Sequence, residues 1–125
     1  MKILVVDDEP AVRNLLKALL SSTEYDVLEA ESGPLALECL RAGHIDLMLT
    51  DMRMSPMDGL ELFTRARELC PHLPVVFLTA HATQATAAKV KEQGAFDYII
   101  KPFRVEALLE TIRRAIEAGG PAAAK

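Results

Sequence analysis

The sequence predicts an α/β domain built on a five-stranded parallel sheet. Short apolar runs alternate along the chain with longer segments in which apolar residues recur at the helical period of 3.6. Such alternation is typical of strands joined by crossover helices. Half of the 125 residues are hydrophobic, which is enough for one core without disulfides or structural metal. We therefore expect a single doubly wound domain with right-handed crossovers.

The apolar runs define the expected strands, at residues 3–6, 26–30, 45–50, 75–79 and 96–100. The first, third and fourth are continuous apolar runs, as expected for strands covered by helices on both faces. Periodicity does not determine the strand order. We take the order 2-1-3-4-5, and with it a flavodoxin-like (βα)5 arrangement, from the class of doubly wound sheets that this pattern matches.

The first two helices follow from apolar spacing and from proline and glycine. Pro10 suits the first turn of a helix. The core face of this helix is expected to hold Val12, Leu15, Leu16 and Leu19. The second helix is expected over residues 34–42, with Gly43 as the glycine that ends it.

The third helix is expected to begin at Asp58, because Glu61 three residues later completes a pattern similar to a capping box. Pro71 ends it. Its expected core face is Leu62, Phe63, Ala66 and Leu69. The core face of the last helix is expected to be Val105, Leu108, Leu109, Ile112 and Ile116.

The fourth helix, expected over residues 83–93, differs from the others because its apolar face is mostly alanine. That face is Ala82, Ala85, Ala88 and Val90. Burying a large aliphatic side chain contributes roughly 1.5–3 kcal/mol, so this helix should be anchored more weakly and respond more readily to a small input. An alanine-rich helix packed close to the sheet is an equal alternative.

Composition argues against several functions. The formal net charge is −4 and both signs are scattered, with no basic run of the kind that nucleic acid requires. The apolar run at residues 1–6 is too short for a signal peptide or a membrane span. We expect a soluble, cytoplasmic domain over residues 1–118, followed at 119–125 by a flexible tail or the start of a linker.

Neither the cysteines nor the histidines form a pattern of metal ligands. Cys39 and Cys70 stand alone in apolar contexts and are interpreted as small core residues. The histidines lack ligand spacing and are interpreted as surface or loop residues: His44, His72 and His81.

Polar side chains follow four of the expected strands. Asp7 and Asp8 follow the first strand, Asp51 the third, Thr79 closes the fourth, and Lys101 follows the fifth. Because ligands of parallel α/β sheets bind at the carboxyl ends of the strands, we expect these groups to gather there. Crowded carboxylates favour a hard divalent cation such as Mg²⁺.

A carboxylate can also act as a nucleophile and form an aspartyl phosphate. Lys101 and Thr79 could then hold oxygens of the transferred group, since such transfer depends mainly on positioning and charge neutralisation. Taken singly, Asp7 and Asp8 could be helix caps, Thr79 an ordinary strand residue and Lys101 a solvated loop charge. Their joint placement favours a site.

The chain resembles a response regulator receiver domain of two-component signalling over residues 1 to about 118. The stretches that carry the resemblance are ILVVDDE at 3–9, LTDMRM at 49–54, MDG at 57–59, VFLTA at 76–80 and DYIIKPF at 97–103. The chemotaxis regulators are receivers of this type. GAFDY at 94–98 is most similar to receivers that precede enhancer-binding ATPase modules.

The resemblance implies a phosphoacceptor, a metal and their ligands. Asp51 is then the phosphorylation site and a metal ligand, with Mg²⁺ as the cofactor and Mn²⁺ as a substitute. Asp8 is expected to bind the metal directly, Asp7 through water, and Arg53 through its backbone carbonyl.

It also implies a switch. Thr79 becomes the conformational hydroxyl, Lys101 the phosphate-binding lysine, and Tyr98 the aromatic residue that turns inward as Thr79 moves. The Lys101–Pro102 bond is expected to be cis. Arg53 and His81 fall where family members adjust the lifetime of the acyl phosphate.

The sequence departs from the family pattern at two places. The loop after Asp51 has Pro56 one residue later than usual, which constrains Ser55 toward extended geometry and leaves the loop shape open. Arg104 stands where a helix-capping residue is common, so the last helix should start less firmly.

These observations favour a signalling switch that accepts a phosphoryl group from a sensor histidine kinase or a phosphotransfer protein. It would catalyse only its own phosphorylation and dephosphorylation and then change its preference for an output domain or target protein. Homodimer formation on phosphorylation is left open, and no contact with nucleic acid or membrane is expected. The alternatives are a receiver-like module that acts without phosphorylation, and a Mg²⁺-dependent phosphohydrolase. The latter would need an acid–base carboxylate where Arg53 stands.

Overall fold

The computed structural model describes residues 1–80 and 84–119, which form five strands and five helices in alternation. The elements are β1 (Lys2–Val6), α1 (Pro10–Leu20), β2 (Asp26–Ala30), α2 (Gly33–Ala42), β3 (Leu47–Thr50), α3 (Gly59–Leu69), β4 (Val75–Thr79), α4 (Gln84–Glu92), β5 (Asp97–Ile100) and α5 (Val105–Gly119). All strand pairs are parallel, in the order β2-β1-β3-β4-β5. The predicted fold class and strand order are confirmed.

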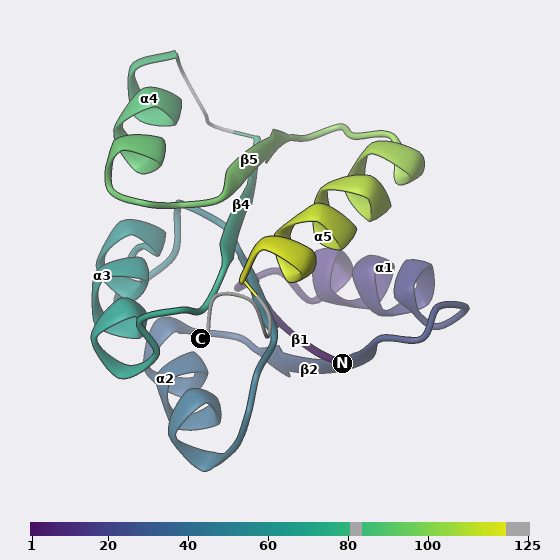
Figure 1. Cartoon of the computed structure of the whole chain (residues 1–125), viewed down its shortest axis with the longest axis horizontal. Helices are drawn as coiled ribbons and strands as arrows, with labels where there is room; N and C mark the ends of the chain where they lie inside the picture. Colours follow the sequence, from purple (N-terminus) through teal and green to yellow (C-terminus); the bar gives the residue numbers. More distant parts are fainter. Residues whose placement is uncertain (81–83, 120–125) are drawn as a thin grey trace.

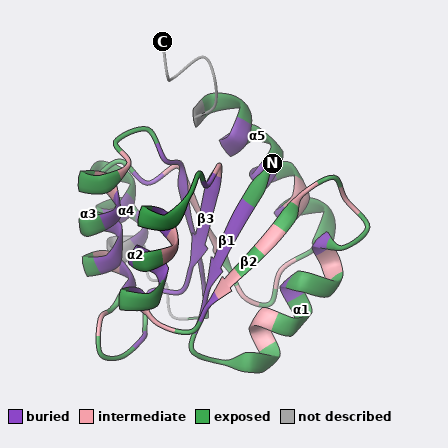
Figure 2. Ribbon diagram, turned by 90° about the horizontal axis from the view of Figure 1, so that it is seen from below, coloured by how far each residue is buried: buried purple, intermediate pink, exposed green. Residues whose placement is uncertain are grey.

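The helices cover both faces of the sheet. Helices α1 and α5 lie on one face, and α2, α3 and α4 lie on the other (Figure 1). Side chains of β1 alternate between the two sides, since Ile3 belongs to the core under α1 and α5, whereas Leu4 belongs to the core under α2 and α3. On the second side, the rings of Phe63 and Phe77 meet edge to face at 5.8 Å. Figure 2 shows the central strands buried and the edge strand β2 more exposed.

Local sequence explains where several helices begin. Pro10 is the first residue of α1, and the side chain of Ser32 accepts the Leu35 N–H at the start of α2. Asp58 caps α3 by accepting the N–H of Glu61 at 2.8 Å, as predicted. Each of these residues suits the first turn of a helix or its cap.

Three leucine and valine positions predicted to face the core are exposed. Leu15, Leu69 and Val105 are 50%, 42% and 38% exposed. The cause is helix geometry: α1 buries Leu16 and Leu20, which lie four residues apart on one face, and Leu15 is turned about 100° away from Leu16. The apolar pattern was broader than the face that the sheet covers.

Two further predictions were wrong in detail. In α4 the buried residues are Ala87 and Val90, whereas Ala88 is exposed; Ala82 and Ala85 lie outside the residues whose burial is described. Helix α2 ends before Gly43, as predicted, but Gly43 has φ −172°, which is extended backbone and not the left-handed glycine conformation that commonly ends helices.

The strands β2 and β4 have the predicted bounds, and the other boundaries differ by one or two residues. The strand β3 starts at Leu47, two residues later than expected, although the Asp46 N–H already donates to the carbonyl of Lys2 in β1 at 2.9 Å. Helix α5 runs to Gly119, and residues 120–125 of the expected tail lie outside the described part. Cys39 and Cys70 are free and only partly buried at the edge of the core. Among the described residues, no helix is both long and apolar enough to cross a membrane.

Candidate functional site

Four strands have their carboxyl ends side by side at one edge of the sheet. They are β1, β3, β4 and β5. The N–H of Asp51 donates to the carbonyl of Val6 at 3.2 Å, so the ends of β3 and β1 lie side by side. The N–H of Lys101 donates to the carbonyl of Thr79 at 3.0 Å, which does the same for β5 and β4. Backbone pairing therefore places the groups that follow these strands next to one another.

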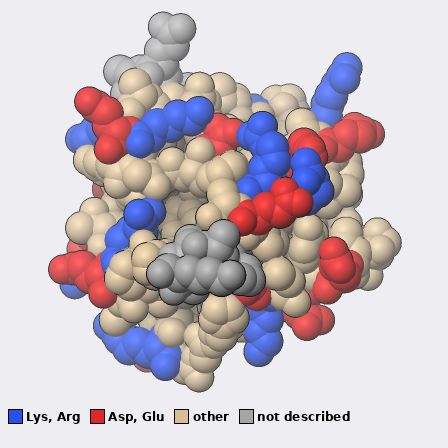
Figure 3. Space-filling model, in the orientation of Figure 1, with Lys and Arg blue, Asp and Glu red and all other residues tan. Residues whose placement is uncertain are grey.

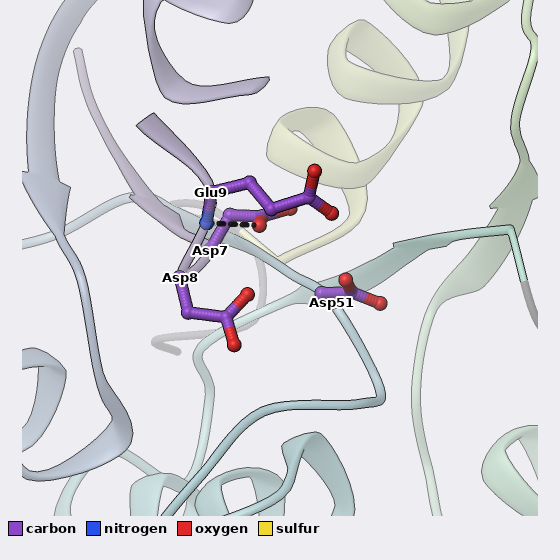
Figure 4. A group of neighbouring side chains, drawn as sticks. All are labelled: Asp7, Asp8, Glu9 and Asp51. Atoms are coloured by element: carbon purple, nitrogen blue, oxygen red, sulfur yellow. Dashed lines mark hydrogen bonds between the residues drawn. The ribbon is translucent and has the colours of Figure 1, made fainter. Parts of the chain in front are cut away.

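Four carboxylates converge at this edge. Asp7, Asp8 and Glu9 follow β1 and Asp51 follows β3 (Figure 4), and one oxygen from each lies within 4.8 Å of the others. Asp7 and Asp51 are buried, while Asp8 and Glu9 are exposed. We call these four residues the acidic cluster. Carboxylate oxygens are the donors that Mg²⁺ prefers, so the cluster has the chemistry of a site for a hard cation.

The two oxygens of Asp51 have different surroundings. Oδ1 accepts the N–H of Met52 at 2.7 Å and that of Arg53 at 3.4 Å. Oδ2 lies 3.8 Å from Nζ of Lys101. One oxygen is thus held by the backbone of its own loop, and the other faces the amine.

The start of α3 supports this loop from behind. The Gly59 N–H donates to the carbonyl of Met52 at 2.9 Å. A Cβ at position 59 would run into the carbonyl oxygen of Asp51 and come within 2.8 Å of the Cα of Met52. Only glycine allows α3 to begin this close to the loop.

Asp7 is in an unfavourable electrostatic position. Its burial raises the pKa of the Asp7 carboxyl above the ordinary value. The Glu9 N–H donates to Oδ1 at 2.9 Å and Lys101 lies 3.3 Å from Oδ2, and both oppose the rise in pKa, while the charge of Asp51 adds to it. The net effect is a raised pKa, so the ionised cluster lacks enough positive charge. A divalent cation would supply that charge.

The other predicted site residues lie around the acidic cluster. Thr79 is fully buried at the end of β4. Asp8 and Arg53 line a hollow of about 410 Å³ that also includes Ser55 and Asp58. The Lys101–Pro102 bond is cis, as the resemblance implied, and the Ser55–Pro56 bond of the altered loop is cis as well.

Tyr98 lies farther from the acids, on β5, and is half-buried. The ammonium of Lys91 lies 5.7 Å from the centre of its ring and 3.4 Å from a carboxylate oxygen of the neighbouring Asp97. His81 lies outside the described residues. His44 pairs with Asp46 at the opposite edge of the sheet.

Two residues near the site were not predicted from the sequence. Glu9 was included only in the stretch ILVVDDE that carries the resemblance, and its adjacency to Asp7 and Asp8 was the available signal. Arg13 donates to the backbone carbonyl of Asp7 at 2.6 Å, and no local pattern in the sequence indicates this contact.

The charged residues elsewhere do not form a patch of one sign on the visible face. Lys and Arg are interspersed there with Asp and Glu (Figure 3). Many of them form pairs, such as Arg113 with Glu110 and Glu117 on α5.

Comparison with known proteins places the chain among signalling domains. Residues 3–113 match the family model described as response regulator receiver domain. The chain is 39% identical to the transcriptional regulatory protein GlrR of Escherichia coli over 96% of its length, and 38% identical to the DNA-binding transcriptional regulator NtrC of that organism over 90%. It spans about a quarter of each relative, 27% and 24%.

Solved structures agree. A response regulator receiver domain protein from Clostridium thermocellum superposes with a TM-score of 0.87 at 33% identity, covering 93% of this chain and 94% of that one. NtrX from Brucella abortus gives a TM-score of 0.88 at 32% identity, covering 94% of this chain and 27% of NtrX.

Proposed function

Because the chain belongs to the response regulator receiver domain family, we propose that it accepts a phosphoryl group on Asp51 in a Mg²⁺-dependent reaction. The observation that carries the proposal is the orientation of Asp51. Its Oδ1 is held by the N–H groups of Met52 and Arg53, and its Oδ2 faces Lys101 at 3.8 Å beside three further carboxylates. This is an acceptor oxygen next to a cation and a site for a second cation.

The acidic cluster supplies the metal ligands in this proposal. Asp8 and Asp51 hold Mg²⁺ directly, together with the backbone carbonyl of Arg53, and Asp7 holds it through water. Mn²⁺, which prefers the same oxygen donors, can substitute. Bound there, the metal neutralises charge on the incoming phosphoryl group and on the acids around it.

The residues of the chain then position the transfer. Asp51 Oδ2 attacks phosphorus and forms an O–P bond while the P–N bond to the donor histidine breaks. The imidazole nitrogen keeps the bonding electron pair and takes up a proton. Lys101 and Thr79 hold oxygens of the transferred group, which is the main contribution that proteins make to phosphoryl transfer. The domain catalyses only its own phosphorylation and dephosphorylation.

Phosphorylation acts as a switch in this scheme. Thr79 moves toward the new phosphoryl oxygens, and Tyr98 turns inward into the space behind it. Such a modification biases an equilibrium between two states. The surface around α4, β5 and α5 then changes its affinity for a partner.

We infer the partners from the family. The donor is a sensor histidine kinase or a phosphotransfer protein. Since GlrR and NtrC are named as transcriptional regulators and the chain spans about a quarter of each, the target is an output domain of such a regulator. Residues 1–118 serve as the cytoplasmic phosphoacceptor unit, and contacts with nucleic acid are left to the output domain.

The test is to incubate the chain with Mg²⁺ and a small acyl phosphate or phosphoramidate and to measure its intact mass. We expect one phosphoryl adduct in the wild type, none without divalent cation, and none in Asp51→Asn. Asp58→Asn is the matched control: it removes a neighbouring carboxylate, keeps a good helix cap, and should keep the adduct.

Each other outcome contradicts the proposal in a distinct way. An adduct that persists in Asp51→Asn would show that the acceptor is another residue. Absence of an adduct in the wild type would favour a module that acts without phosphorylation. Steady turnover of a generic phosphoester would indicate a phosphohydrolase.

A further inference from the structure

Arg13 connects the acidic cluster to the edge strand of the sheet. It lies in the first turns of α1 and its side chain is 13% exposed. One of its Nη atoms donates to the backbone carbonyl of Asp7 at 2.6 Å, and its Nε donates to a carboxylate oxygen of Glu29 at 3.2 Å. Glu29 lies on β2 and is also paired with Lys17 at 2.8 Å. The guanidinium thus bridges the loop after β1 and the neighbouring strand.

The contact with Asp7 determines the orientation of Asp8. The carbonyl of Asp7 and the N–H of Asp8 belong to one peptide unit, which is planar and rigid. A donor that fixes this carbonyl therefore fixes the plane from which Asp8 extends. On the other side, the N–H of Asp7 donates to the carbonyl of Ala30, the residue after Glu29, at 3.2 Å. Both polar groups of the Asp7 backbone are thereby held from the end of β2, one directly and one through Arg13.

The planar guanidinium suits this role better than an ammonium would. It carries five N–H donors in a fixed fork and can hold two acceptors in different directions at once. Its two contacts use different nitrogens, Nε for Glu29 and Nη for the Asp7 carbonyl. A single ammonium would not span both in the same geometry.

We propose that Arg13 is a positioning residue that orients the Asp7–Asp8 peptide for metal binding, with Glu29 holding the guanidinium in place. This inference rests on the proposed function, because it concerns the same metal site. Arg13 acts through the backbone and touches neither the metal nor the phosphoryl group.

When Arg13 is replaced, the loss of its charge and the loss of the peptide orientation should change the Mg²⁺ affinity in opposite directions. This makes the inference testable. Removing a positive charge near four carboxylates strengthens their attraction for a cation. Losing the peptide orientation weakens binding, since partners that orient metal ligands typically contribute tenfold or more to affinity. The direction of the change in Mg²⁺ affinity therefore separates the two explanations.

The experiment measures the Mg²⁺ Kd of the full chain by isothermal titration calorimetry for wild type, Arg13→Met, Arg13→Lys and Lys17→Met. We expect Arg13→Met to weaken binding about tenfold and Arg13→Lys to remain weaker than wild type despite its charge. Lys17→Met is the matched control: it removes a positive charge from the same Glu29 without a contact to Asp7, and should bind Mg²⁺ at least as tightly as wild type.

A second measurement does not depend on metal. Hydrogen exchange of the Asp7 and Asp8 amides, followed without Mg²⁺, should accelerate in Arg13→Met and not in Lys17→Met. Urea unfolding of each variant verifies that the rest of the fold is retained.

The outcomes remain separable from those of the proposed function. Arg13→Met that binds Mg²⁺ as tightly as wild type, or more tightly, would overturn the positioning role. A wild-type chain that binds no Mg²⁺ would instead contradict the proposed function. In that case unchanged amide exchange in Arg13→Met would also refute the structural part of the inference.

Discussion

The two edges of the sheet hold acids under opposite electrostatic conditions: the half-buried Asp46 at the amino edge and the buried Asp7 at the carboxyl edge. At the amino edge, burial alone would raise the pKa of Asp46, but the Lys2 N–H at 2.7 Å, the ring of His44 at 2.7 Å and the chain's amino terminus outweigh it, so the pKa of Asp46 is lowered. At the carboxyl edge, burial dominates and the pKa of Asp7 is raised. The residue type and the sheet are the same, yet the shifts differ in sign.

The difference lies in burial and in how the partners are shared, because each acid accepts one backbone N–H and contacts one basic side chain, but Asp7 is the more deeply buried of the two. Asp46 receives a backbone N–H and a histidine for itself. Asp7 shares Lys101 with Asp51 and faces its charge as well. An acid satisfied by its own partners stabilises the fold, whereas acids that share one partner leave negative charge uncompensated. On the proposed function, a divalent cation compensates this negative charge and so allows an anionic phosphoryl group to approach.

The largest effect that we expect is the loss of stabilisation by Mg²⁺ when Asp51 is replaced. If Asp51 proved dispensable, the two edges of the sheet would not differ as described. On the proposed function, Mg²⁺ at 100 times its Kd raises the free energy of unfolding of the wild type by about 2.7 kcal/mol. Asp51→Asn should lose most of this gain along with the phosphoryl adduct, because it removes a ligand and the acceptor. Urea unfolding with Mg²⁺ and with EDTA measures the gain. Asp46→Asn should retain it, and equal losses in the two variants would show that the edges do not differ.

The second effect concerns packing behind the acidic cluster. Gly59→Ala should lower the free energy of unfolding by about 3 kcal/mol, the upper part of the range for overpacking, because the new Cβ meets the backbone of Asp51 and Met52. Gly43→Ala is the control, since no atom lies within 4 Å of the Cβ built there, and should stay within about 0.5 kcal/mol. Chemical denaturation compares the two, and a Gly59→Ala protein as stable as Gly43→Ala would contradict the geometry.

The third effect tests the amino edge alone. Asp46→Asn should lower the free energy of unfolding by about 1 kcal/mol at neutral pH, the size expected for hydrogen bonds to a half-buried carboxylate. Since the folded pKa of Asp46 is below its unfolded value, its contribution is present above the unfolded pKa and lost as the pH falls through the folded one. The difference between wild type and variant should therefore shrink below about pH 4, the ordinary pKa of aspartate. A difference that stays constant down to pH 2 would assign the effect to packing.

The smallest effect has the opposite sign. Because the folded pKa of Asp7 is raised, its contribution is fully present below the unfolded pKa and is lost as the pH rises through the folded pKa. In EDTA at neutral pH, Asp7→Asn should therefore raise the free energy of unfolding, by less than about 1 kcal/mol, because Asn still accepts the Glu9 N–H. Unfolding in urea at pH 4 and pH 7 provides the measurement. Destabilisation at pH 7 would mean that the Lys101 contact outweighs the repulsion.

Sequence patterns predicted the order of elements and the alignment of the strand ends, because both follow from simple alternation. The cap at Asp58 was also predictable, since a cap and its partner lie three residues apart. The exposed Leu15 was not, because an apolar residue on a helix does not reveal how wide a face the sheet covers. Arg13 was missed for a similar reason. Its partners are on β2 and on the backbone after β1, and no local sequence pattern connects positions that are this far apart in the chain.

The contact between Lys101 and Asp7 joins residues 94 positions apart in the chain. A polypeptide still emerging from the ribosome carries Asp7, Asp8 and Asp51 long before it carries the amine that faces them. Since β5 pairs at the outer edge of the sheet, beside β4, this amine arrives with the last strand to be synthesised. On the proposed function, a chain that stops before β5 lacks the amine that faces Asp51, so the acceptor is complete only once β5 has paired with β4.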